Sequence, residues 1–187
     1  MIVEEQTANS SLERYIASVR SIWGDGKDPQ LPFKVKALME ELFASTSTDE
    51  PWMAELIRDG KPRRELYCDP VHGFIQMGHI HKQGLGNAPH DHGPCWVVYG
   101  SYQGVTEITT YQRTDDGKEE GKAKLQKKEL HRLPPGEVQP YLTGEIHSIE
   151  TAQGPAVVFR FLSYDLEKIE RNRYNLEKGT VMRLTPQ

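Results

Sequence analysis

Three histidines fall in two short segments whose spacing fits a single metal site. The first segment, Gly84–Gly104, carries His90 and His92, and the second, Gly136–Thr151, carries His147. Side chains alternate between the two faces of a strand, so His90 and His92 point to the same side. His147 follows glycines that allow tight turns, which can bring a second strand alongside the first. The two segments therefore predict a site with three imidazole ligands and no carboxylate.

Three neutral nitrogens on one side of an ion leave its other positions open for substrate and oxygen. Such a ligand set is typical of an active site, because a structural site is closed by its protein ligands.

The two segments together resemble the paired motifs of the cupin superfamily, G-x5-H-x-H-x3,4-E-x6-G and G-x5-P-x-G-x2-H-x3-N. Every glycine and histidine of both motifs stands at the matching interval. The chain departs at three positions, where Val97 replaces the glutamate ligand, Leu142 the proline and Thr151 the asparagine. The resemblance implies a mainly β fold, the cupin double-stranded β-helix or jelly-roll barrel, with an N-terminal helical segment.

Because the glutamate ligand is missing, the chain resembles in particular the cupins that bind their metal with three histidines. Cupins with three histidines are similar to the thiol dioxygenases (cysteine and mercaptopropionate dioxygenase) and to acetylacetone dioxygenase. This implies Fe(2+) held by His90, His92 and His147, with a small thiol and O2 as substrates and a sulfinate as product. The alternatives are cleavage of a carbon–carbon bond in a diketone, a zinc or nickel cupin isomerase or lyase, and a sensor that binds a small acid. Three histidines suit zinc as well as iron, so sequence leaves the metal open.

The resemblance to cysteine dioxygenases also implies a carboxylate-binding arginine. Arg64 lies at the matching position, and its planar guanidinium offers a carboxylate two parallel donors. The alternative is a solvated side chain in the basic run of residues 61–64. A shift of one residue would exchange the faces of Arg64 and Arg63.

Four further residues are candidates for the site. Aligned without a gap, Tyr164 matches the tyrosine that assists oxygen chemistry in thiol dioxygenases; with a two-residue gap, Arg160 takes the place of an active-site histidine. Arg160 could bind an anionic substrate or pair with a buried acid. Val97 is expected beside the metal, where it limits water. His79 is interpreted as a strand residue that faces the cavity, and a purely structural role is its alternative.

The patterning predicts one domain, residues 1–187, with a helical lead-in over 1–60 and a β-barrel over 61–187. Apolar residues recur at helical spacing over 12–23, behind a Ser10–Glu13 capping box, and again over 35–43. A third helix is expected from about Asp49 to Gly60, with Pro51 in its first turn. Short strands follow over 65–68, 74–81, 96–99, 105–113, 125–133 and 156–164.

Composition restricts the partners. A net charge of -4 over 187 residues gives no basic footprint, so nucleic acid is not expected. No apolar run approaches the ~18 residues of a membrane helix. Two cysteines without a disulfide framework favour a reduced, cytoplasmic protein. The expected partners are a small-molecule substrate and O2, and a homodimer is allowed for.

Overall fold

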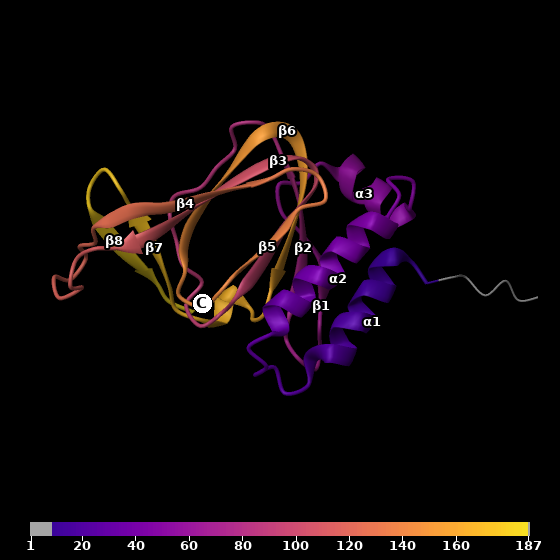
Figure 1. Ribbon diagram of the computed structural model, residues 1–187, viewed down its shortest axis with the longest axis horizontal. Coiled ribbons are helices and arrows are strands. Elements are labelled where there is room, and N and C mark those ends of the chain that lie inside the picture. Colours follow the sequence, from indigo (N-terminus) through magenta and orange to yellow (C-terminus); the bar gives the residue numbers. More distant parts are fainter. Residues whose placement is uncertain (1–8, 187) are drawn as a thin grey trace, which may run out of the picture.

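Helices come before strands in the computed structural model, which describes residues 9–186 (Figure 1). They are α1 (Ser11–Trp23), α2 (Leu31–Ser45) and α3 (Pro51–Asp59). The predicted capping box is present at the start of α1: the Ser10 hydroxyl accepts from the Glu13 amide, and the Glu13 carboxylate accepts from the Ser10 amide at 2.7 Å. Both partners satisfy amides that a helix start leaves without acceptors.

Eight strands and a short 3-10 helix, η1, follow the helices in the described chain. They are β1 (Arg64–Cys68), β2 (Ile75–His81), β3 (Val97–Arg113), β4 (Leu125–Leu133), β5 (Val138–Tyr141), β6 (Ile146–Leu162), η1 (Leu166–Lys168), β7 (Arg171–Asn175) and β8 (Thr180–Leu184). None of the helices within residues 9–186 is both long and apolar enough to cross a membrane.

Two long strands, β3 and β6, each take part in both sheets of a barrel. Residues 97–103 of β3 pair with 157–162 of β6, next to β5 on one side and β2 and β1 on the other; we call this the helix-side sheet. Residues 105–111 of β3 pair with 146–153 of β6, next to β4; we call this the hairpin-side sheet. The predicted fold class is confirmed: a mainly β double-stranded barrel with an N-terminal helical segment.

The expected strands over 96–99 and 105–113 are one strand in the structure. Register shifts lie at residues 101–106, where β3 bends from one sheet into the other. Gly104 lies in this bend with φ +76°, and a Cβ there would stand 2.6 Å from the Gln153 carbonyl oxygen. Gly104 therefore bends a continuous strand rather than separating two strands.

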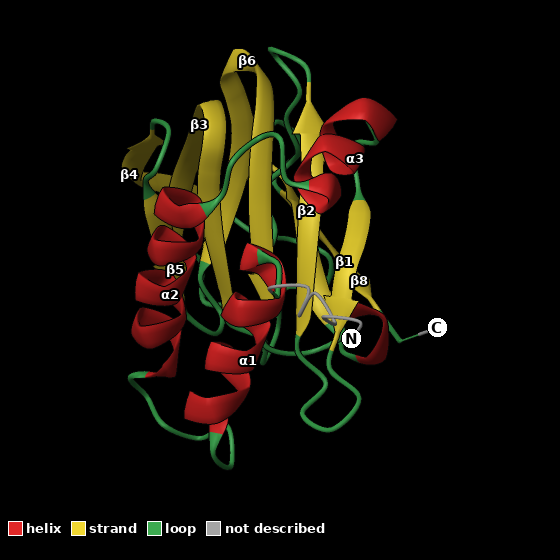
Figure 2. Ribbon diagram, turned by 90° about the vertical axis from the view of Figure 1, so that its right-hand side faces the viewer, coloured by secondary structure: helices red, strands yellow, loops and turns green. Residues whose placement is uncertain are grey.

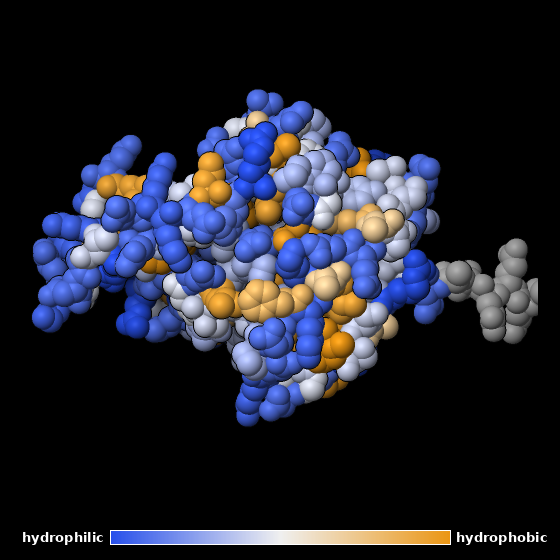
Figure 3. Space-filling model, viewed as in Figure 1, coloured by the Kyte–Doolittle hydropathy of each residue, from blue (hydrophilic) through white to orange (hydrophobic). Residues whose placement is uncertain are grey.

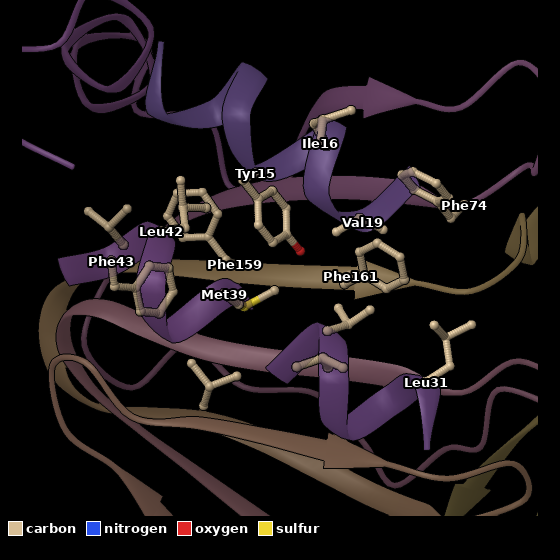
Figure 4. Close-up of a cluster of buried hydrophobic side chains, with 14 of the residues drawn as sticks. Tyr15, Ile16, Val19, Leu31, Met39, Leu42, Phe43, Phe74, Phe159 and Phe161 are labelled. Atoms are coloured by element: carbon tan, nitrogen blue, oxygen red, sulfur yellow. The ribbon is translucent and has the colours of Figure 1, made fainter. Parts of the chain in front are cut away.

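The helices cover the outer face of the helix-side sheet (Figure 2). Side chains of successive β6 residues point alternately to the two sides of this sheet. Phe159 and Phe161, both 0% exposed, pack in a cluster with residues of α1 and α2, including Tyr15, Val19 and Met39 (Figure 4). Val158 lies in a second cluster, inside the barrel. One segment of strand therefore anchors the helices and lines the interior.

Candidate metal centre

The predicted ligands His90, His92 and His147 come together inside the barrel. One ring nitrogen from each lies within 4.8 Å of the others. The Nε2 atoms of His90 and His92 are 3.1 Å apart, close to the roughly 3 Å expected for two nitrogens bound at about 2.1 Å and a right angle on one ion. His92 and His147 are 3% and 1% exposed.

Backbone pairing fixes this arrangement. The segment 84–91 lies along β6 in the hairpin-side sheet, and His90 and His147 are directly opposite, joined by two amide–carbonyl hydrogen bonds of 2.9 Å. Directly opposite residues of an antiparallel pair share a face, so both rings point into the barrel. On the far side of His147, Thr110 of β3 continues the same row.

The histidines fit a metal ion by their chemistry. Nδ1 of His90 lies 3.0 Å from the Ala88 carbonyl oxygen, so Nδ1 carries the proton and Nε2 keeps its lone pair. Both ring nitrogens of His147 are buried without a hydrogen-bond partner among the described residues. Burial, together with the neighbouring His147 and His90, holds the pKa of His92 well below its usual value, and burial does the same to the pKa of His147. The rings are therefore neutral lone-pair donors.

Unpaired polar atoms mark the whole barrel interior. Within residues 9–186, every buried side-chain nitrogen or oxygen without a hydrogen-bond partner belongs to a residue that faces the interior. Buried polar groups are normally satisfied, so these atoms need partners from water or from a ligand inside the barrel. The residues are His79, His81, Tyr99, Ser101, Thr106, His147, Thr151 and Arg160.

Asp91, between two of the ligands, points away from them and holds the β7–β8 hairpin. Asp91 is 5% exposed, and its carboxylate accepts from the Gly93 and Asn172 amides, from Asn172 Nδ2 at 2.9 Å and from the Tyr174 hydroxyl at 2.9 Å. Gly93 has φ +53°, and a Cβ there would lie 2.1 Å from the Glu170 carbonyl oxygen. The ligand segment and the start of the hairpin are thus in close backbone contact.

Replacing Asp91 with alanine is expected to lower the free energy of unfolding by about 2–3 kcal/mol, because buried donors of Asn172 and Tyr174 lose a charged acceptor. Urea denaturation measures the loss, and hydrogen exchange is expected to rise at the amides of β7. Asp116→Ala, at an exposed loop position, is the control. Unchanged exchange in β7 would contradict the role assigned to Asp91.

The opposite, helix-side sheet contributes Arg160. It pairs with Met77 of β2 and Tyr99 of β3, both interior residues that are 3% exposed. The Tyr99 ring lies edge-on to His147, with ring centroids 5.6 Å apart. Nε of Arg160 is buried and has no partner among the described residues. None of the salt bridges within residues 9–186 involves this guanidinium.

His79 and Val97 also face the interior. The Nδ1 atom of His79 lies 2.8 Å from the Pro62 carbonyl oxygen, which leaves Nε2 unpaired. Burial, followed by the nearby charge of Arg160, lowers the pKa of His79 to about 3, so this ring is neutral. Val97 is 1% exposed and packs with Tyr99 and Tyr141. Neither residue is among those that line the cavity at His90 and His92, and their contact with substrate stays a prediction.

A cavity of about 220 Å³ opens at His90 and His92. Its volume lies below the roughly 300–1,000 Å³ of pockets for drug-sized ligands, so it suits a small molecule. Among the described residues that line it are four arginines and one acidic residue, Glu167. The lining is Arg63, Asn87, Ala88, His90, His92, Arg160, Leu166, Glu167, Arg171, Asn172, Arg173 and Leu184.

Two expected site residues lie elsewhere. The guanidinium of Arg64 pairs with Glu55 at 2.9 Å and Asp59 at 2.8 Å, both on α3, and its neighbour Arg63 lines the cavity instead. Tyr164 is 50% exposed and lines a groove beside Trp23 and Trp96, not the histidine cavity. It follows the end of β6 at Leu162, where strand alternation no longer decides the direction of a side chain.

Other residues of the site were missed by sequence reasoning. Arg171 and Arg173 lie on β7, a short polar strand without hydrophobic alternation. The alternation of arginine with Asn172 and Tyr174 is a signal for a strand with one cationic face, but which face reaches the cavity depends on pairing with the ligand segment. Tyr141 packs on His147 with ring centroids 4.8 Å apart.

No protein-family model and no curated protein matches the sequence. Similar solved structures include KdgF from Halomonas sp. (17% identity, 54% of this chain and 76% of that chain, TM-score 0.41). Another is the Cnp3 cupin domain of Schizosaccharomyces pombe (14% identity, 55% of this chain and 60% of that chain, TM-score 0.42). A third is a Klebsiella pneumoniae protein with a double-stranded β-helix domain (14% identity, 56% of this chain and 72% of that chain, TM-score 0.40).

Proposed function

We propose that the protein is an iron(II)-dependent dioxygenase that converts a small, carboxylate-bearing thiol to its sulfinate. One observation supports the choice of substrate: Arg160 lines the same cavity as His90 and His92 and has no acidic partner in residues 9–186. A guanidinium held in such a place without a counter-ion is costly unless an anionic ligand pairs with it. A neutral diketone would leave that charge unpaired.

Iron(II) held by His90, His92 and His147 would supply the redox chemistry with O2 and favour the thiolate form of the substrate. Both oxygen atoms end on sulfur, so that R–SH and O2 give R–SO2H. The chain's own residues bind and orient the substrate. Arg160 is placed to hold the carboxylate by charge-assisted hydrogen bonds, with Arg63 at the cavity wall as a second donor.

The aromatic wall keeps water from the ligands. Tyr99 and Tyr141 are 3% and 1% exposed and pack against His147, and Val97 fills the space beside them. Burial raises the pKa of both tyrosines, so their hydroxyls stay protonated. The Tyr99 hydroxyl has no partner among the described residues and can donate to a bound anion, whereas the Tyr141 hydroxyl lies 3.0 Å from Nδ1 of His131.

Oxygen uptake by anaerobically iron-loaded protein tests the proposal. The substrates are 3-mercaptopropionate, cysteine and acetylacetone, each added separately. Uptake with a thiol acid, matched mole for mole by sulfinate, is the expected result. Bound iron with no uptake for either thiol, or uptake with acetylacetone alone, would contradict it.

Replacing Arg160 with glutamine is expected to raise the KM for the thiol acid about 10-fold or more, since one charge-assisted hydrogen bond of roughly 1.5–3 kcal/mol is lost. Steady-state oxygen uptake measures it. Arg64→Gln is the matched control, because the Arg64 guanidinium is occupied by Glu55 and Asp59. A larger KM change in the Arg64 variant than in the Arg160 variant would reverse the assignment.

A further inference from the structure

The β7–β8 hairpin adds a row of cations to the metal centre. Strand β7 runs antiparallel to the ligand segment: the Asp91 amide donates to the Asn172 carbonyl at 3.0 Å, the Tyr174 amide donates to the Pro89 carbonyl at 2.8 Å, and His90 is opposite Arg173. Opposite residues share a face of the sheet.

Side-chain contacts agree with this register. Asn172 and Tyr174 both reach Asp91 on the face turned away from the ligands. Arg171 and Arg173 therefore lie on the other face, next to His92 and His90, and both line the cavity.

The charge of the cavity is strongly one-sided. Arg63, Arg160, Arg171 and Arg173 line it with Glu167 as the only acid among the described lining residues. Like charges gathered around so small a volume repel one another, and an anionic ligand relieves the repulsion. Hydrophilic residues also dominate the surface at the end where β7 and β8 lie (Figures 1 and 3).

The hairpin is also held in position. Asp91 fixes it through Asn172 and Tyr174, and Nη1 of Arg171 donates to the Leu166 carbonyl, which limits the movement of that guanidinium. A donor held in place loses less freedom on binding than a free surface arginine does.

We propose that Arg171 and Arg173 form a second anion subsite and that the substrate is a small dianion, a thiol with two carboxylates. One carboxylate pairs with Arg160 on the helix-side sheet, and the second pairs with the hairpin arginines across the cavity. The inference rests on the proposed function for the reaction, while the subsite itself is defined by binding alone. Two acidic groups on a short carbon chain suit a cavity of about 220 Å³.

Mercaptosuccinate and 3-mercaptopropionate test the subsite, because they differ by one carboxylate. Their affinities for zinc-loaded protein, which carries out no oxygen chemistry, are measured by anaerobic titration calorimetry. Mercaptosuccinate is expected to bind about 10-fold or more tightly than 3-mercaptopropionate. The Arg171→Gln/Arg173→Gln double variant is expected to lose this preference. Arg183→Gln is the control, since Arg183 lies on β8 and pairs with Glu170.

A single Arg173→Gln variant guards against a folding defect, because the Arg173 side chain is exposed. It is expected to lower the preference severalfold while circular dichroism and zinc content stay at wild-type values. Equal affinities for the two acids in the wild type, or a preference that survives in the double variant, would overturn the subsite. Since no turnover is involved, a failure of thiol oxidation contradicts only the proposed function, and oxidation without a preference for the diacid contradicts only the subsite.

Discussion

His147→Ala is expected to abolish stoichiometric metal binding while the barrel stays folded. His147 supplies one of three ligands, and removal of a mere orienting partner already costs roughly 10–100-fold in metal affinity. Loss of a ligand costs more. The side chain points into the barrel and makes no hydrogen bond with the described residues, so its removal leaves no buried donor unpaired.

Metal content after iron or zinc loading and dialysis measures this effect, with far-UV circular dichroism to monitor the fold. His72→Ala is the control, since His72 stacks near Phe74 and Trp23 on the helix side of the sheet, away from the ligands. Retention of one metal ion per chain by the His147 variant would refute the three-histidine site.

Phe159→Ala is expected to lower the free energy of unfolding by about 3–5 kcal/mol, the cost of removing a buried aromatic ring and leaving a cavity. Phe159 is 0% exposed and contacts Phe43, Trp52 and Tyr102 edge-on, with ring centroids 5.3, 6.0 and 6.4 Å away. These partners come from both helices and strands, so the space cannot be refilled by a small movement of one side chain.

Urea denaturation followed by tryptophan fluorescence measures this loss. Leu130→Ala is the matched control: Leu130 is 57% exposed on β4, and its truncation is expected to change stability by less than about 0.5 kcal/mol. A loss below 1 kcal/mol for Phe159→Ala would show that the helices contribute little to holding the barrel.

The metal ligands could be predicted from sequence because their geometry is local. His90 and His92 need only an extended backbone to share a face, and glycines mark where the segment with His147 turns back. The helices could also be predicted from sequence, since each carries its own apolar stripe and α1 has its own capping box.

The positions of Arg64 and Tyr164 could not be predicted from local sequence patterns. Alternation says that Arg63 and Arg64 point to opposite faces, but not which face is inside. Salt bridges with Glu55 and Asp59 on α3 hold the Arg64 side chain on the outside of the barrel. Tyr164 lies beyond the end of β6, and the gap-free alignment that matched it to the tyrosine of thiol dioxygenases does not bring it to the histidine cavity.

The hairpin arginines depend on contacts that no local pattern contains. Strand β7 pairs with a segment about 80 residues earlier, and a single carboxylate, Asp91, sets its register through Asn172 and Tyr174. Which arginines line the cavity can therefore be seen only in the folded structure.

The passage of β6 through both sheets restricts how this site can evolve. One strand carries His147 at its beginning and Arg160 near its end, with Phe159 and Phe161 alternating toward the helices. Insertion of one residue between them would turn phenylalanines into the cavity and the guanidinium into the core at once. New specificities are thus confined to side-chain replacement on the strand and to changes in the C-terminal hairpin, whose length can vary without disturbing the ligand His147 on β6.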